Sequence, residues 1–210
     1  MKNIELYHAL TMYGDVYPLK IKCDPDSILD HANRYQFVQY NPRKDIPRKG
    51  LSIFSLDGGM SGVPDLDSLK LFNEEYGTDH SERHFDVPTP VFTESVELQK
   101  FLKPFKGNLF RSHFIRLNPG GYFPPHRDMY GINMYSFRIV VPLKNVNPPN
   151  VMFGFGSEAS CVWQKGSMYF FNTNLTHYLV NMSAEDSDWM VLNVALNEDT
   201  VNTVSYNLMM

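Results

Sequence analysis

The stretch Pro124-Pro125-His126-Arg127-Asp128, followed closely by Arg138-Ile139-Val140-Val141-Pro142-Leu143, indicates how this sequence folds. The second stretch is rich in β-branched residues, which is typical of a buried β-strand. In the first stretch His126 and Asp128 are two residues apart, so in an extended chain their side chains point to the same side. The pattern predicts an imidazole and a carboxylate aimed at one point beside a β-sheet.

Short runs of β-branched and aromatic residues, separated by turn signals, continue from Asn108 toward the end of the chain. Asn118-Pro119-Gly120-Gly121 and Lys165-Gly166 are two of these turns. We expect strands near residues 109–117, 138–143, 151–155, 167–171, 177–180 and 189–196. So many short antiparallel strands predict a sandwich or barrel whose mouth can hold a site.

The first half of the chain has a mixed pattern. Asp24-Pro25 is a helix start, and further helices are expected over 66–76, ending at Gly77, and over 95–103, ending before Pro104. The polar loop 78–90 between them is a candidate lid. We predict one structural domain, in which a mixed α/β N-terminal part (1–105) packs on a mainly β core (106–210).

Composition narrows the possible classes of function. The chain has 210 residues, 43% of them hydrophobic and 20% charged, with a net charge of −4. This balance predicts neither nucleic-acid nor membrane partners. Only two cysteines, Cys23 and Cys161, are present, and the N-terminus has no apolar segment typical of a signal peptide. We therefore expect a cytoplasmic protein.

A third metal ligand is expected from a neighbouring strand, and His177 is the best candidate. It follows the aromatic pair Phe170-Phe171 and precedes an apolar run. Two histidines and one carboxylate form the facial triad of non-haem iron(II) oxygenases, which leaves positions open for a co-substrate and oxygen. A His-x-Asp pair alone occurs often by chance, so the surrounding sequence decides its meaning.

That surrounding sequence resembles the aspartyl/asparaginyl β-hydroxylase branch of the 2-oxoglutarate oxygenases. The matching stretches are Leu117–Gly121, Pro125–Asp128, Arg138–Leu143 and Trp163–Asn172, followed by His177 and Asn181. The resemblance covers about residues 108–197. It implies a mainly β fold with a double-stranded β-helix core, jelly-roll or cupin-like, made of two antiparallel sheets.

The resemblance also implies a chemistry and its site residues. Fe(II) is expected on His126, Asp128 and His177, with 2-oxoglutarate as co-substrate. Decarboxylation of 2-oxoglutarate to succinate and carbon dioxide then accompanies hydroxylation of an unactivated carbon. The substrate is expected to be an amino-acid side chain, free or in a peptide, or a similar small molecule. The sequence indicates neither the particular substrate nor the oligomeric state.

The 2-oxoglutarate carboxylate needs a cation, and arginine suits it because its planar fork donates two hydrogen bonds. Arg138 matches the family arginine that opens the strand after the metal motif. The family usually has a second arginine about ten residues past the distal histidine, but this chain reads Ser187-Asp188-Trp189-Met190 there. Either Arg116 replaces it, or Arg138 binds the co-substrate with help from hydroxyls such as Tyr135, or 2-oxoglutarate is not used.

Several neighbouring residues have two possible roles. Asn172 and Asn181 either support a ligand or close a turn. Trp163, Phe170 and Phe171 are expected in the core. Tyr130, Met134 and Tyr135, which follow Asp128, are candidates for the pocket wall.

Three functions compete at this point. The first is an Fe(II)- and 2-oxoglutarate-dependent hydroxylase. The second is a cupin-like metalloenzyme that does not use 2-oxoglutarate, which the missing last-strand arginine favours. The third is a non-catalytic β-helix that works as a binding module, which the complete triad opposes.

Overall fold

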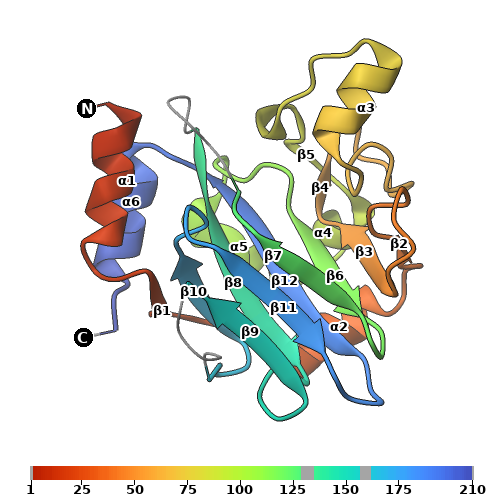
Figure 1. Cartoon of the computed structure of the whole chain (residues 1–210). Coiled ribbons are helices and arrows are strands. Elements are labelled where there is room, and N and C mark those ends of the chain that lie inside the picture. Colours follow the sequence, from red (N-terminus) through yellow and green to blue (C-terminus); the bar gives the residue numbers. More distant parts are fainter. Residues whose placement is uncertain (1, 129–134, 157–161, 210) are drawn as a thin grey trace.

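A computed structural model of the chain describes residues 2–128, 135–156 and 162–209. Tyr130, Met134 and Cys161, which the sequence singled out, lie outside the described residues. The expected mainly β fold is confirmed: two antiparallel sheets face each other, and helices pack against the outer face of the larger one (Figure 1).

The larger sheet has seven strands in the order β1-β10-β8-β12-β6-β3-β2. Each neighbouring pair is antiparallel. In the order of the sheet, the strands are β1 (Val16–Lys22), β10 (Ser167–Phe171), β8 (Ser136–Lys144), β12 (Ser187–Ala195), β6 (His113–Leu117), β3 (Arg48–Ser52) and β2 (Val38–Gln39).

The smaller sheet has the order β7-β11-β9 and lies over the middle of the larger one. Its strands are β7 (Tyr122–His126), β11 (His177–Asn181) and β9 (Val151–Phe155). A separate pair is formed by β4 (Phe54–Ser55) and β5 (Val87–Pro88).

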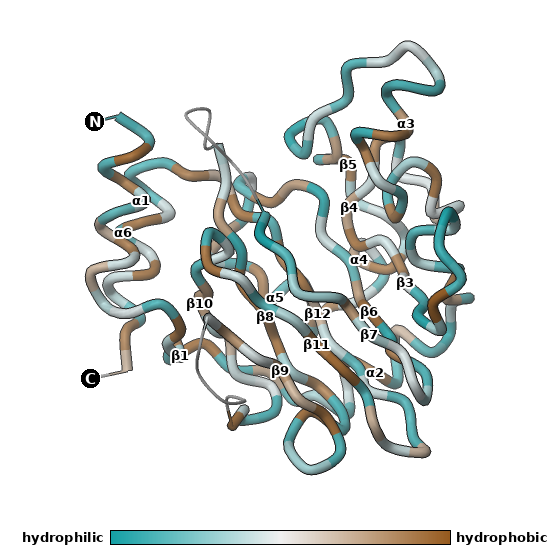
Figure 2. Tube along the Cα trace, in the orientation of Figure 1, coloured by the Kyte–Doolittle hydropathy of each residue, from teal (hydrophilic) through white to brown (hydrophobic). Residues whose placement is uncertain are grey.

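Residues of the larger sheet alternate between two apolar layers, as the period of a β-strand requires. On β8, Ile139 and Val141 join the layer under the helices, whereas Val140 joins the layer between the two sheets. Hydrophobic residues accordingly follow β8, β12 and β6 in Figure 2. Both faces of these strands are covered, which explains why apolar residues occur at successive positions as well as at alternate ones.

The helices cover the outer face of the larger sheet and one of its edges. α1 (Asn3–Thr11) lies beside α6 (Glu198–Tyr206), while α2 (Pro25–Ala32) contacts β8 and α5 (Val96–Leu102). The remaining helical segments are α3 (Leu69–Tyr76), α4 (Pro90–Thr93), η1 (Glu82–His84) and η2 (Lys103–Phe105). In the described parts of the chain, no helix is both long enough and apolar enough to span a lipid bilayer.

The helix expected over 66–76 begins later, at Leu69, because the residues before it have other partners. The Asp67 carboxylate accepts hydrogen bonds from Arg43 Nε at 2.9 Å and from the Ser68 backbone N–H at 2.7 Å. Leu66 is fully buried. The helix ends at Gly77, whose φ of 63° lies in the left-handed region that glycine favours, as predicted.

Strands from the N-terminal part extend both edges of the larger sheet. β1 pairs with β10 at one edge, and β3 pairs with β6 toward the other. The sequence pattern did not reveal these strands. The expected division near residue 105 stays a prediction.

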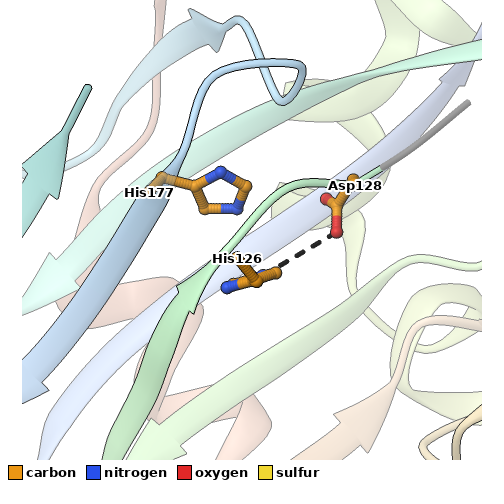
Figure 3. Close-up of side chains that lie close together, drawn as sticks. All are labelled: His126, Asp128 and His177. Atoms are coloured by element: carbon orange, nitrogen blue, oxygen red, sulfur yellow. Dashed lines mark ion pairs between the residues drawn. The ribbon is translucent and has the colours of Figure 1, made fainter.

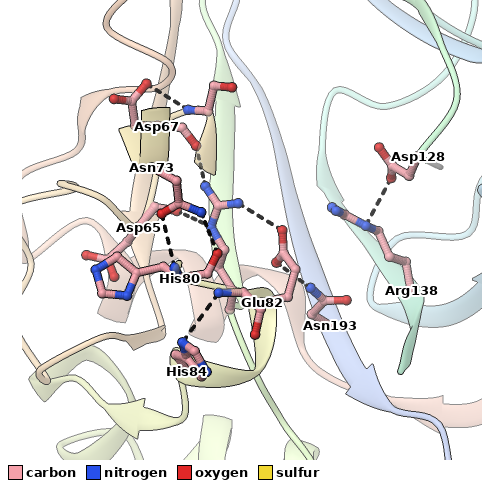
Figure 4. A network of polar contacts seen from close by, with 12 residues as sticks. Asp65, Asp67, Asn73, His80, Glu82, His84, Asp128, Arg138 and Asn193 are labelled. Carbon is pink, nitrogen blue, oxygen red and sulfur yellow. Dashed lines mark hydrogen bonds and ion pairs between the residues drawn. The ribbon is translucent and has the colours of Figure 1, made fainter. Parts of the chain in front are cut away.

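The loop over 78–90 is anchored to the barrel through Glu82. Arg111 Nη1 donates to Glu82 Oε1 at 2.9 Å, and Asn193 Nδ2 donates to Glu82 Oε2 at 2.6 Å (Figure 4). The side chain of Arg111 is only 9% exposed. A nearly buried guanidinium therefore depends on this carboxylate.

We predict that Glu82→Ala lowers the free energy of unfolding by about 2–3 kcal/mol, since removing one partner of a buried ion pair leaves the other charge uncompensated. The cost falls short of a fully buried pair because the Glu82 side chain keeps 24% exposure. Urea unfolding measures it. The matched control is Glu74→Ala, whose carboxylate is 60% exposed and which we expect to change stability by less than about 0.5 kcal/mol. Equal effects of the two substitutions would contradict this account.

Candidate metal centre

Two of the predicted ligands are brought together by the pairing of β7 with β11. His126, the last residue of β7, lies directly opposite His177, the first residue of β11. Directly opposite residues of antiparallel strands place their side chains on the same face. The two imidazole rings are accordingly 4.2 Å apart between centroids.

Asp128 completes the cluster from the segment that follows β7. Its backbone N–H donates to the Thr173 carbonyl at 3.0 Å, which fixes this segment against the turn that precedes β11. Asp128 Oδ1 lies 3.7 Å from His126 Nε2. The three side chains converge on one point, and their potential ligand atoms all lie within 4.8 Å of one another (Figure 3).

Hydrogen bonds to the backbone select which nitrogen of each histidine is available. His126 Nδ1 is 2.7 Å from the Pro124 carbonyl, and His177 Nδ1 is 3.0 Å from the Leu175 carbonyl. A carbonyl can only accept, so Nδ1 carries the proton and Nε2 carries the lone pair in the neutral ring. Burial lowers the pKa of His177, which favours this neutral form. The donor set of two imidazoles and one carboxylate fits a divalent metal such as iron(II).

Arg138 lies immediately beside this cluster, at the start of β8. Its Nε donates to Asp128 Oδ2 at 3.0 Å (Figure 4). The two oxygens of Asp128 are thus divided: Oδ2 is bonded to Arg138, while Oδ1 faces the histidines. This division favours a carboxylate that binds a metal through one oxygen.

A pocket opens from the cluster into the space between the two sheets. The polar groups at one end are His126, Asp128, Arg138 and His177, and Tyr40 and Tyr178 also line it. The apolar wall consists of Ile115, Phe123, Val140, Phe153, Phe171, Leu179, Trp189 and Val191. Among the described residues that line the pocket, Arg138 is the one cation.

The structure does not bring Arg116 to this pocket. Arg116 Nε donates to Asp188 Oδ1 at 2.6 Å, and its guanidinium stacks on the Phe37 ring at 4.2 Å. Its neighbour on β6, Ile115, faces the pocket, so Arg116 points to the opposite face of the sheet. Its predicted role as a co-substrate ligand has no support in this geometry.

The last strand provides no cation at the position where the family usually has one. Ser187 and Trp189 share a face of β12, and Trp189 Nε1 donates to Ser187 Oγ at 2.7 Å. The Trp189 ring lines the pocket, whereas Asp188 pairs with Arg116 on the other face.

The two asparagines with open roles close turns. Asn172 Oδ1 accepts from the Tyr7 hydroxyl at 3.0 Å and from the Asn174 backbone N–H at 3.1 Å, which shapes the turn leading to His177. Asn181 Nδ2 donates to the carbonyls of Leu117 and Glu185 at 2.9 and 2.7 Å. Neither lines the pocket.

The aromatic residues divide between core and pocket. Trp163 and Phe170 are buried, as expected, and Phe171 is both buried and part of the pocket wall. Tyr135 is 44% exposed and stacks under Arg83. Sequence reasoning missed Tyr40 and Phe123, because neither belongs to a motif with a recognisable chemistry.

A sequence model described as aspartyl/asparaginyl β-hydroxylase matches residues 68–197, which is more than half of the chain. No curated protein matches the sequence.

Two solved structures resemble the fold over most of its length. A prolyl-4-hydroxylase from Pseudomonas putida has 10% identity and a TM-score of 0.50, covering 94% of this chain and 100% of that one. An oxidoreductase of the 2OG-Fe(II) oxygenase family from Burkholderia pseudomallei has 13% identity and a TM-score of 0.46, covering 82% and 78%. At this identity, the likeness to the prolyl-4-hydroxylase shows a shared fold.

The matched region contains β6 to β12, with both histidines, Asp128 and Arg138. The expected resemblance is confirmed: this protein is a hydroxylating oxygenase that belongs to the aspartyl/asparaginyl β-hydroxylase family.

Proposed function

We propose that the protein is an Fe(II)- and 2-oxoglutarate-dependent hydroxylase that acts on an amino-acid side chain, free or within a peptide. The observation that carries the proposal is the cluster of His126, Asp128 and His177, in which both histidines present Nε2 to one point beside an arginine. In this proposal the three residues hold the metal and Arg138 binds the co-substrate.

A bound iron(II) would supply the oxygen chemistry that side chains lack, and the protein would supply position and environment. The Nδ1–H bonds to Pro124 and Leu175 fix the orientation of both rings. Apolar side chains wall the pocket beside the metal end, which itself is open to solvent, since the His126 side chain is 36% exposed.

Arg138 would bind the carboxylate at the keto-acid end of the co-substrate, which is the end that lies at the metal. Its bond to Asp128 places the guanidinium next to a metal ligand. A keto acid bound at the metal would bring its carboxylate to this neighbourhood. Arg138 would then stabilise the negative charge of that carboxylate with charge-assisted hydrogen bonds.

The alternative is a metalloenzyme of cupin-like fold that does not use 2-oxoglutarate. Trp189 in place of a last-strand cation favours it. The binding of different keto acids distinguishes this alternative from the proposed 2-oxoglutarate-dependent hydroxylase.

The cytoplasmic location expected from the low cysteine content also stays a proposal.

We predict that His126→Ala and His177→Ala each weaken iron(II) binding by more than about 100-fold, because losing a ligand exceeds the 10–100-fold effect of losing a residue that only supports one. Competition with a chromogenic chelator under anaerobic conditions measures the affinity. His8→Ala, an exposed histidine on α1, is the matched control and keeps the affinity of the wild type. Undiminished iron binding by both site variants would exclude this metal centre.

We predict that Arg138→Gln keeps iron(II) binding within about tenfold but weakens the binding of keto acids by about 10- to 100-fold, the effect of losing a hydrogen bond to a charged group. The loss should be the same for 2-oxoglutarate and for 2-oxobutanoate, which has no second carboxylate. Calorimetric titration of the anaerobic iron-loaded protein measures both. A loss confined to 2-oxoglutarate would move Arg138 to the far end of the co-substrate and refute the assignment.

A further inference from the structure

Arg48, on β3, is a buried charge that pairs with no carboxylate in the part of the chain that the structure describes. The residue is 3% exposed, and its Nε has no hydrogen-bond partner among the described residues. Its Nη1 donates to the Tyr122 carbonyl at 3.0 Å. Burial lowers the pKa of the guanidinium, which reflects the cost of keeping an unpaired charge away from water.

The other arginines with little exposure are all paired with carboxylates. These ion pairs are Arg111–Glu82, Arg116–Asp188 and Arg138–Asp128. Among the residues that the structure describes, no carboxylate pairs with Arg48 in the same way. The fold therefore keeps one cation in a state that an anionic ligand would stabilise.

The strand register places Arg48 on the face of the sheet that forms the pocket. Arg48 lies opposite Leu117 and Gly50 lies opposite Ile115, in the pairing of β3 with β6. Ile115 lines the pocket. Arg48 is two residues from Gly50, the partner of Ile115, so Arg48 and Ile115 lie on the same face of the sheet. A Cβ on Gly50 would lie 2.8 Å from Leu66 Cδ1 and 3.1 Å from the Tyr40 ring, so the absence of a side chain there makes room for Tyr40.

Two rings that line the pocket lie directly against the guanidinium. Arg48 Cζ is 4.2 Å from the centroid of the Phe123 ring and 5.2 Å from that of Tyr40. Phe123 in turn stacks near His126, with 6.3 Å between ring centroids. Phe123 thus separates the metal ligands from Arg48, whereas Arg138 directly contacts a metal ligand. Arg138 lines the pocket itself, whereas Arg48 lies behind two rings of the pocket wall.

Further polar groups lie on the same face, four residues farther along the pairing of β3 with β6. Ser52 is directly opposite His113, two residues before Ile115 on β6. Ser52 Oγ and both ring nitrogens of His113 are buried and have no partner among the described residues. The His113 ring is 5.4 Å from the ring of Tyr40. Buried polar groups are nearly always hydrogen-bonded, so such a cluster points to a polar ligand.

We propose that Arg48 binds the far carboxylate of a dicarboxylate co-substrate whose other end lies at the metal. The inference rests on the proposed function and names the residue that replaces the cation missing from β12. Arg138 alone cannot serve both ends, because its Nε is bonded to a metal ligand. A five-carbon keto diacid would place one carboxylate near Arg138 and the other beyond Phe123.

The test compares 2-oxoglutarate with 2-oxobutanoate, which shares the keto acid but lacks the far carboxylate. Calorimetry with the anaerobic iron-loaded protein gives the affinity for each. Wild-type protein should bind 2-oxoglutarate at least tenfold more tightly. Arg48→Met should weaken 2-oxoglutarate binding by about 10- to 100-fold and leave 2-oxobutanoate binding unchanged. Arg48→Lys, which keeps the charge, should show a smaller loss with the same selectivity, and it carries the test if the Met variant does not fold.

The matched control is Arg116→Met. Arg116 stacks on an aromatic ring at the same 4.2 Å, but it is paired with Asp188 on the opposite face, so its loss should not change the preference for 2-oxoglutarate. A second readout is the melting temperature without ligand. Arg48→Met should match or exceed the wild type, since it removes an unpaired buried charge. A melting temperature lowered as far as that of Arg116→Met would show a structural ion and contradict the inference.

The outcomes separate the two proposals. If wild-type protein binds both keto acids equally, the use of 2-oxoglutarate fails and the role of Arg48 fails with it. If wild-type protein prefers 2-oxoglutarate and Arg48→Met keeps that preference, the proposed function stands and the inference about Arg48 is wrong.

Discussion

The pairing of β7 with β11 is the constraint on which the site depends. It sets His126 opposite His177, and it places both rings on the face that looks toward the larger sheet. A shift of one residue in this register would turn one histidine away from the other, because side chains alternate along a strand. The bond from Asp128 to Thr173 then adds the carboxylate at little cost, since the chain is already held at the end of the strand.

Charge is distributed around this centre in a way that favours anions. The metal cluster contains a single carboxylate, and one oxygen of that carboxylate is already bonded to Arg138. Arg48 adds a buried positive charge on the same face of the larger sheet, behind Phe123 and Tyr40. Between these cations the walls are apolar, so charge interactions in the pocket are weakly screened. Such a site suits a ligand with two negative ends and a short carbon chain.

The sequence predicted the centre of the molecule better than its edges. The strands over 151–155 and 167–171 were placed at their observed bounds, because each is an apolar run between clear turn signals. β1 and β3 were missed, since their sequences contain proline, glycine and charged residues and both form strands by pairing with β10 and β6. The pair His126 and Asp128 could be predicted because its spacing reflects a local chain geometry, and His177 was added from its place before an apolar run and from the family resemblance. Arg48 could not be predicted, because it stands out only by being buried without a carboxylate partner among the described residues, and this property exists only in the folded chain.

The most direct test of the central claim is a crystal structure of the anaerobic protein with iron(II) and 2-oxoglutarate. The account predicts one ion bound by His126 Nε2, His177 Nε2 and one oxygen of Asp128, with the other oxygen still bonded to Arg138. The keto acid should chelate the same ion. An ion bound elsewhere, or bound through the Nδ1 atoms that now face Pro124 and Leu175, would contradict it.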